Sequence, residues 1–314
     1  MWFRRAKAQQ YEETALEKLV AEFALDAERF HQHSIPDGGA ERYSQMSGMQ
    51  LDASATRLYH RVEKGFSLPT PRRPFGARAI PGLNRVLASE HADLDALYAR
   101  EARLILEALA QWNDHGDLND QVAPPGESLP TNPLDPETLA TFITSRHSVR
   151  DFDQRPVDRA LISEAVRLGG YAPSVCNRQG WRAYWFDDRE DIARILADHR
   201  GSAGFADRVP GLFVITYDLR AFEETRERNQ GWIDAGLFSM TLLLALHGLG
   251  LGAVPLNWSR RNSASRRIRR NAALPEHENV VMLIAAGHPA PGYRVARSAR
   301  RPVSEILRFG MPSA

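Results

Sequence analysis

The first 115 residues space their apolar side chains as helices do. In residues 11–33 and 88–112, apolar residues recur every three or four positions, which places them on one face of a helix. Between these segments, residues 60–76 contain three prolines and two glycines, so we expect no helix there. The pattern therefore predicts a mostly helical N-terminal region with one irregular connection.

Residues 113–134 carry hardly any periodic apolar signal. This stretch is rich in proline, glycine, asparagine and aspartate, a composition typical of linkers. We place a domain boundary in it. The prediction is a helical N-terminal extension with its linker over residues 1–130, followed by a second domain over residues 131–314.

The second domain alternates between helical and strand patterns. Asp135 followed by Pro136 is a helix N-cap with a first-turn proline, and Asp158 caps a second helix. Continuous apolar or alternating bulky runs predict strands. The order of elements predicts a layered α+β domain, with strands at residues 181–186, 211–218 and 279–287, and further helices at residues 190–199 and 231–247.

Residues 232–256 form the most apolar run of the chain. Asp234 and His247 bound its uninterrupted apolar part, residues 235–246, which is shorter than the roughly 20 residues that span a bilayer. A helix that is apolar on every side is otherwise a core or interface helix. We therefore expect no membrane association.

Composition excludes several other classes of function. The formal net charge of +1 argues against bulk attraction to nucleic acid or anionic lipid. The single cysteine, Cys176, excludes an intramolecular disulfide and a cysteine-clustered zinc site, and we expect no metal site. The N-terminus has no apolar signal-peptide core, so we expect a cytoplasmic protein.

One short segment concentrates cations and hydrogen-bond donors. Residues 144–153, "TSRHSVRDFD", contain Arg146, His147, Ser148 and Arg150. The planar fork of arginine matches phosphate oxygens, so two arginines with a hydroxyl can clamp a phosphate or a polar ring. Alone, the cluster is more typical of the solvated charges at a helix end than of such a clamp.

Four later segments change this interpretation. They are "YAPSVCNRQGWR", "GLGLGAVPLNW", "NVVMLIAAGHP" and "RSARRPVSEIL". With the cationic segment, they follow in the order and spacing of the FMN-dependent nitroreductase family, which residues 135–308 resemble. The resemblance implies a three-layer α-β-α domain with a central, mostly antiparallel or mixed sheet, and a homodimer that binds FMN at its interface.

The resemblance also implies roles for individual residues. The FMN phosphate, ribityl chain and pyrimidine edge would contact Arg146, His147, Ser148 and Arg150. A second subunit would lay Pro173, Ser174 and Asn177 along the ring. The N5 side would face Pro255, Leu256, Asn257 and Trp258, with a backbone N–H of Asn257 or Trp258 donating to N5 as the catalytic contact. The phosphate would be closed off by Arg300, with Arg297 as helper. Many relatives carry Glu-Gly at 257–258, so we expect the Trp258 ring to narrow the substrate space.

Residues 60–76 leave two interpretations open. Similar His-x-x-Glu-Lys-Gly stretches accompany nitroreductase-like proteins from surface-polysaccharide gene clusters. The segment is either a substrate-facing loop with Glu63 or His60 as proton donor, or an internally paired turn that packs the helical region on the core.

The resemblance implies an FMN-dependent NAD(P)H oxidoreductase. NADH or NADPH would reduce FMN, and a small electron-poor molecule would then accept the hydride in a ping-pong cycle. Two alternatives stay open: an FMN-dependent dehydrogenase of a dedicated sugar or modified peptide, and a non-catalytic scaffold subunit.

Overall fold

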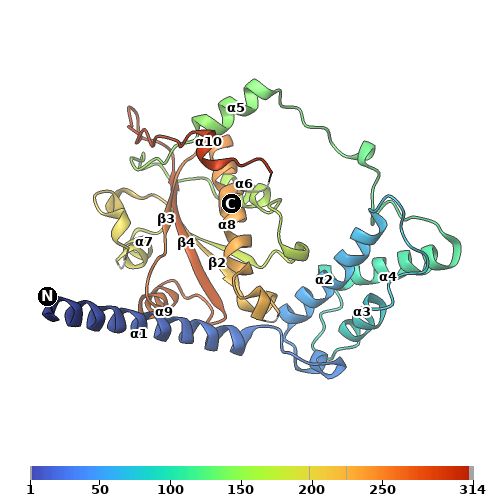
Figure 1. The fold of residues 1–314 in the computed structure, drawn as a ribbon. Coiled ribbons are helices and arrows are strands. Elements are labelled where there is room, and N and C mark those ends of the chain that lie inside the picture. The colour runs from blue at the N-terminus through green and yellow to red at the C-terminus, as the bar shows by residue number, and fades with distance from the viewer. Residues whose placement is uncertain (1, 198, 224, 311–314) are drawn as a thin grey trace.

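The N-terminal region is mostly helical, as the apolar spacing predicts, but the helix predicted over residues 88–112 begins only at Leu97, after turns at residues 88–96. The computed structural model describes residues 2–310 apart from 198 and 224, with side chains from residue 15 onward. Figure 1 shows α1 as a long helix beside a bundle of three others. These four helices are α1 (Trp2–His33), α2 (Gly48–Phe66), α3 (Ala79–Leu87) and α4 (Leu97–His115).

The predicted irregular connection begins later than expected. Helix α2 continues through Glu63, Lys64 and Gly65 to Phe66, so the expectation of no helix is wrong for residues 60–66. Gly65 is tolerated for a packing reason. A Cβ at this position would lie 2.7 Å from Cε2 of Phe75, so only glycine lets the Phe75 ring close on the helix.

A four-stranded antiparallel sheet lies at the centre of the second region. Its order is β1-β2-β4-β3, and β2 is buried along its whole length. The sequence did not predict β3, because Pro255 and neighbouring glycines interrupt the strand pattern. Proline is compatible with β3 because that strand lies at the sheet edge. The strands are β1 (Trp181–Phe186), β2 (Leu212–Asp218), β3 (Gly252–Asn257) and β4 (Glu278–Gly287).

Helices cover both faces of this sheet. The helix at Pro136 starts as predicted, because the Asp135 carboxylate accepts hydrogen bonds from two first-turn N–H groups. The helix at Arg159 also starts as predicted, with the Asp158 carboxylate accepting from the Ala160 N–H. The helices are α5 (Pro136–Ser145), α6 (Arg159–Gly169), α7 (Arg189–Leu196), α8 (Gln230–Gly248), α9 (Asn262–Asn271) and α10 (Val303–Ile306). Short 3-10 turns are η1 (Ala40–Gln45), η2 (Gly126–Ser128), η3 (Val175–Asn177), η4 (Arg200–Ser202), η5 (Ala206–Arg208), η6 (Leu219–Ala221) and η7 (Thr225–Glu227).

Two apolar cores give the fold its three layers. One core joins α6, α8 and the bundle α2–α4 to one sheet face, around Phe213 and Leu242. The other joins α7 and α9 to the opposite face, around Val214 and Ile268. The predicted α+β, three-layer architecture is confirmed. Among the described residues, no helix combines the length and apolarity that crossing a bilayer requires.

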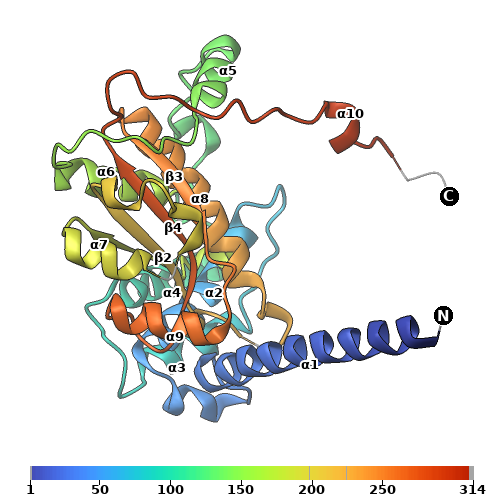
Figure 2. The same ribbon diagram turned by 90° about the vertical axis from the view of Figure 1, so that its left-hand side faces the viewer.

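Two segments project from this body. Figure 2 shows α1 and residues 291–310, here called the C-terminal arm, extending from the same side. Every residue of the arm is exposed, and α1 is exposed along most of its described side chains. An exposed apolar helix face in one copy implies another surface that covers it.

Candidate cofactor site

A cationic pocket lies where α5 ends, α8 ends and β3 begins. Its volume is about 250 Å³. Arg146 and His147 line it from the α5 side, and His247 lines it from the last turn of α8. The other lining residues are Ser145, Val149, Leu243, Gly250, Leu251, Gly252, Ala253, Pro289, Tyr293 and Val295.

Backbone contacts hold the cationic segment on the sheet. Ser148 forms a parallel bridge with Ala253, and the Val149 N–H donates to the Ala253 carbonyl at 3.1 Å. Gly252 permits this approach, because a Cβ there would lie 2.9 Å from the Val149 side chain. Arg146 and His147 are therefore fixed over the start of β3.

The electrostatic field of the pocket is positive. Burial, and then the charges of Arg146 and His147, lower the pKa of His247. The His247 Nε2 lies 2.9 Å from the Ser145 hydroxyl, and the His147 Nδ1 lies 2.9 Å from the Ser145 carbonyl. Neighbouring cations that disfavour protonation of an imidazole also favour a bound anion.

Only some of the residues predicted to bind the FMN phosphate lie in this pocket. Ser148 is half-buried beside it, and Arg150 is exposed, with its Nη1 3.4 Å from the Ser148 carbonyl. Arg297 and Arg300 lie in the exposed arm, where Arg300 donates to the Ser298 carbonyl. The arm begins at the pocket, since its residues Tyr293 and Val295 line the wall.

Pro173, Ser174 and Asn177 lie at the opposite end of α8. The buried Asp234 carboxylate, in the first turns of α8, accepts from the Val175 N–H at 3.2 and 3.3 Å. Asp234 and His247 are separated by thirteen residues, which is about 20 Å along a helix. A single chain therefore keeps this predicted ring-binding segment away from its own cationic pocket.

The end of β3 presents alternate residues to opposite sides. Pro255 and Asn257 are exposed, whereas Leu256 and Trp258 are buried in the core beneath α7 and α9. The Trp258 Nε1 donates to the Ser265 hydroxyl at 3.0 Å. The expectation that the Trp258 ring narrows the substrate space is therefore wrong, because packing holds that ring inside the core.

His60 and Glu63 lie on α2 and not in a loop. The His60 Nδ1 is 3.0 Å from the Glu63 Oε2, one helical turn away. This pairing agrees with the internally paired alternative. Helix α2, which carries both residues, packs against η3.

Sequence reasoning missed a second, larger cavity. This aromatic groove, of about 840 Å³, lies between α1, residues 34–37 and the start of α8. Its walls include the side chains Phe23, Phe30, Tyr217, Trp232, Asp26 and Asp37. The apolar periodicity of residues 11–33 was the available signal, but periodicity cannot tell which surface covers a helix face.

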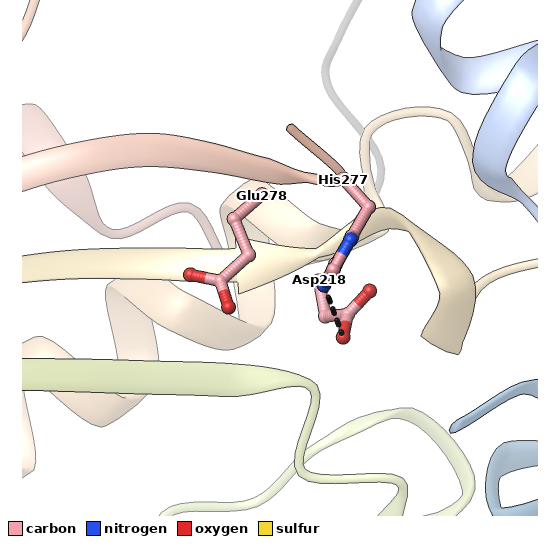
Figure 3. A group of neighbouring side chains, drawn as sticks. All are labelled: Asp218, His277 and Glu278. Carbon is pink, nitrogen blue, oxygen red and sulfur yellow. Dashed lines mark ion pairs between the residues drawn. The ribbon is translucent and has the colours of Figure 1, made fainter. Parts of the chain in front are cut away.

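One cluster of potential metal ligands occurs within the described residues. Figure 3 shows Asp218, His277 and Glu278 at one end of the sheet, with ligand atoms within 4.8 Å of one another. Both carboxylates already have partners. Asp218 pairs with Arg220 at 2.7 Å, and Glu278 accepts from the Tyr184 hydroxyl at 2.8 Å and from Thr216. We interpret the cluster as a structural hydrogen-bond network.

Comparison with known proteins identifies the second region. A family model described as the nitroreductase family matches residues 143–288. A Methanothermobacter thermautotrophicus protein named NADH dehydrogenase/NAD(P)H nitroreductase is 30% identical over 156 residues, covering 48% of this chain and 78% of that protein. The chain belongs to the nitroreductase family. Membership of this family makes it, in general terms, a flavin-dependent oxidoreductase. The resemblance inferred from the sequence is confirmed.

Two further family members delimit the similarity. A Bacillus subtilis FMN reductase (NAD(P)H) is 25% identical over 51% of this chain and 67% of that protein. A crystal structure of a Bacillus subtilis nitroreductase has a TM-score of 0.50 at 16% identity, covering 56% of this chain and 100% of that chain, and shows the shared fold. The family match leaves out α1–α4 and the C-terminal arm.

Proposed function

We propose that two copies of this chain bind FMN between them, accept electrons from NADH or NADPH, and pass them to a small electron-poor molecule in a ping-pong cycle. One observation carries the proposal. The cationic pocket lies at one end of α8, and the segment Pro173–Asn177 lies at the other, so the two predicted halves of the site can meet only across two chains.

The residues of the pocket suit one end of FMN. A guanidinium and an imidazole converge with backbone glycines, a donor set that matches a phosphate. The volume of about 250 Å³ is below the range of roughly 300–1,000 Å³ typical of complete small-molecule sites. This supports the idea that one copy builds only part of the cofactor site.

The exposed face of α8 offers the surface for pairing. Ile233, Leu237 and Met240 are 55%, 42% and 45% exposed, and they follow one another at helical spacing. Gly236 lies in the same stripe, and nothing lies within 4 Å of its Cβ position. A two-fold axis across this face makes the paired helices antiparallel, which sets the pocket of one copy beside η3 of the other.

Each half of the composite site would then have its own task. Arg146 and His147 would hold the phosphate, and Arg150 would offset negative charge on the pyrimidine edge. A backbone N–H of Asn257 or Trp258 would donate to N5, and FMN supplies the hydride chemistry at that atom. The second copy would contribute Pro173, Ser174 and Asn177, with His60 or Glu63 as proton donors on the adjoining helix.

Two measurements test the proposal. The purified protein should show a flavin absorption spectrum that bleaches with NADH or NADPH under anaerobic conditions. Flavin that stays oxidised with both reductants would refute the proposed direction of electron flow. Light scattering should give twice the chain mass, and Leu237→Arg should shift it to the monomer, whereas Leu118→Arg, at a leucine of similar exposure, should not.

A further inference from the structure

A series of buried ion pairs connects the N-terminal helices to η3. It begins at Glu223, which lies between η6 and η7 and whose side chain is 5% exposed. The Glu223 carboxylate pairs with Arg42 of η1 at 2.5 Å and with Arg57 of α2. Both arginines lie outside residues 143–288, the stretch that matches the nitroreductase family. The match therefore does not explain these pairs.

Glu227, the last residue of η7, continues the series. Its Oε2 accepts from the Glu223 N–H at 2.7 Å. Its two carboxylate oxygens also accept from the Arg178 guanidinium, at 2.7 and 2.9 Å. Burial disfavours the ionised form, but the hydrogen bonds and the charge of Arg178 outweigh it and lower the pKa of Glu227. This forked geometry fixes the orientation of the guanidinium as well as its position.

Arg178 follows η3 directly, and its side chain is fully buried. Its Nη1 donates to the Ala221 carbonyl at 2.8 Å, and its Nε donates to the Val175 carbonyl at 3.2 Å. A guanidinium removed from water is costly unless such partners stay in place. Arg178 therefore joins η3 to the residues that precede α8.

The backbone around η3 requires such support. Cys176, Asn177 and Gln179 have φ values of 49°, 55° and 48°, in the left-handed region that residues other than glycine rarely adopt. A conformation of this kind persists only where surrounding contacts fix it. Arg178 lies between Asn177 and Gln179, so its buried ion pair is well placed to supply the constraint.

We propose that Arg178 is a positioning residue for the flavin ring, and that Arg57 supports it from the N-terminal region through the two glutamates. This inference rests on the function proposed above, in which Ser174 and Asn177 lie along that ring. The N-terminal region thereby contributes to FMN affinity through contacts that the family-matched residues alone cannot make.

Hydrogen exchange of the apoprotein measures this support without the cofactor. The Val175 N–H donates to Asp234, the Asn177 N–H to the Ser174 carbonyl, and the Gln179 N–H to the Ser174 hydroxyl. These amides exchange only when the segment opens, so mass spectrometry of a peptide covering residues 174–179 reports its opening.

Arg57→Met is the informative variant. It leaves Arg42 as a partner for the buried Glu223 carboxylate, so the chain should still fold. We expect residues 174–179 to exchange about tenfold faster than in the wild type, while the buried strand β2 stays protected. Arg57→Lys keeps the charge and should restore most of the protection. The control is Arg61→Met, at an exposed arginine one turn further along α2, which should exchange as the wild type does.

FMN titration measures the consequence for the cofactor. Arg57→Met should weaken FMN binding about fivefold, and Arg178→Met should weaken it at least as much. In the Arg178→Met background, Arg57→Met should have no further effect, because the connection is already broken. If Arg178→Met does not fold, Glu227→Gln takes its place, since the amide keeps an acceptor and removes the charge.

The possible outcomes separate this inference from the proposed function. If Arg57→Met exchanges as slowly as Arg61→Met in a protein that binds FMN, the support is refuted and the proposed function stands. If exchange accelerates but neither Arg57→Met nor Arg178→Met changes FMN affinity, the ion pairs hold η3 and the role toward the flavin is refuted, together with the proposed placement of Ser174 and Asn177.

Discussion

The Nε2 of His199 lies 3.2 Å from the backbone carbonyl oxygen of Asn257. The imidazole must donate in this contact, because a carbonyl can only accept. The bond ties the end of β3, where the N5 donor is predicted, to the residue that begins η4. Within the described chain, the buried Nδ1 of His199 has no hydrogen-bond partner, so the ring is suited to the neutral form.

This relationship predicts a loss of stability in mild acid. Burial, and to a lesser degree the charge of Arg260, lower the pKa of His199 from its ordinary value of 6.5. The unfolded chain then binds the proton more readily, so the free energy of unfolding is highest above pH 6.5 and falls as pH drops below it. By pH 5.5 the loss from one histidine is at most about 1.4 kcal/mol.

Thermal melts at pH 7.5 and 5.5 measure the effect. His199→Gln keeps a side-chain donor without the titration, so its two melting temperatures should differ less than those of the wild type. The exposed His91→Gln should retain the wild-type difference. Identical pH dependence of His199→Gln and wild type would exclude His199 as the source.

Arg146 is expected to contribute strongly to cofactor affinity. Arg146→Ala removes a charged donor from the cationic pocket, and a charged hydrogen bond contributes about 1.5–3 kcal/mol, so FMN should bind roughly 10–100 times more weakly. Arg146→Lys should fall between, because lysine keeps the charge and loses the planar fork. Titration of apoprotein with FMN, followed by flavin fluorescence, gives the affinities.

The control for Arg146 is Arg155→Ala. Arg155 is exposed and pairs with Asp153 at 2.9 Å, away from the pocket lining. If Arg155→Ala weakens FMN binding as much as Arg146→Ala does, the loss of any positive charge has this effect. The assignment of the cationic pocket as the phosphate site would then be wrong.

Local sequence signals predicted most of the second region. The caps Asp135 and Asp158 set helix starts, and continuous burial made β2 recognisable from its apolar run. Strand β3 was missed because proline and glycine obscure the strand pattern. Its identity as a strand depends on pairing with β4, a contact distant in sequence that local patterns cannot reveal.

The candidate site was only partly predictable for the same reason. Arg146 and His147 adjoin in sequence and meet in the pocket. His247 joins them only through packing of α8 against α5, and no local pattern indicated that. The Trp258 side chain was misplaced because strand alternation, which directs it into the core, could not be applied to an unrecognised strand.

Two glycines of α8 should respond oppositely to substitution. A Cβ at Gly231 would lie 2.2 Å from Cδ2 of the buried Tyr217 ring, so Gly231→Ala should cost about 1–3 kcal/mol of folding free energy. Gly236→Ala meets no atom of its own chain within 4 Å, so in the monomeric Leu237→Arg background it should leave stability equal or raise it by up to about 1 kcal/mol. Urea denaturation compares them, and equal destabilisation would contradict the packing of Tyr217 on α8.

Asp234 is predicted to support both the stability of the fold and the affinity for FMN, because it anchors η3. Its buried carboxylate accepts from the Val175 N–H and from the Gln230 side chain at 2.8 Å. Asp234→Ala leaves these donors unpaired, so we expect a loss of about 1–3 kcal/mol and weaker FMN binding, because Ser174 and Asn177 lose their anchor. Asp234→Asn should lose less than alanine, since burial raises the pKa of Asp234 and an amide keeps an acceptor.

The matched control for this coupling is Ser239→Ala. Ser239 is also buried on α8, but among the described residues its hydroxyl bonds only to the Ala235 carbonyl one turn earlier. Its removal should leave FMN affinity unchanged whatever it does to stability. Denaturation and FMN titration of the three variants together decide the point. If Asp234→Ala lowers stability and binds FMN as tightly as Ser239→Ala, then η3 does not contact the cofactor in the dimer.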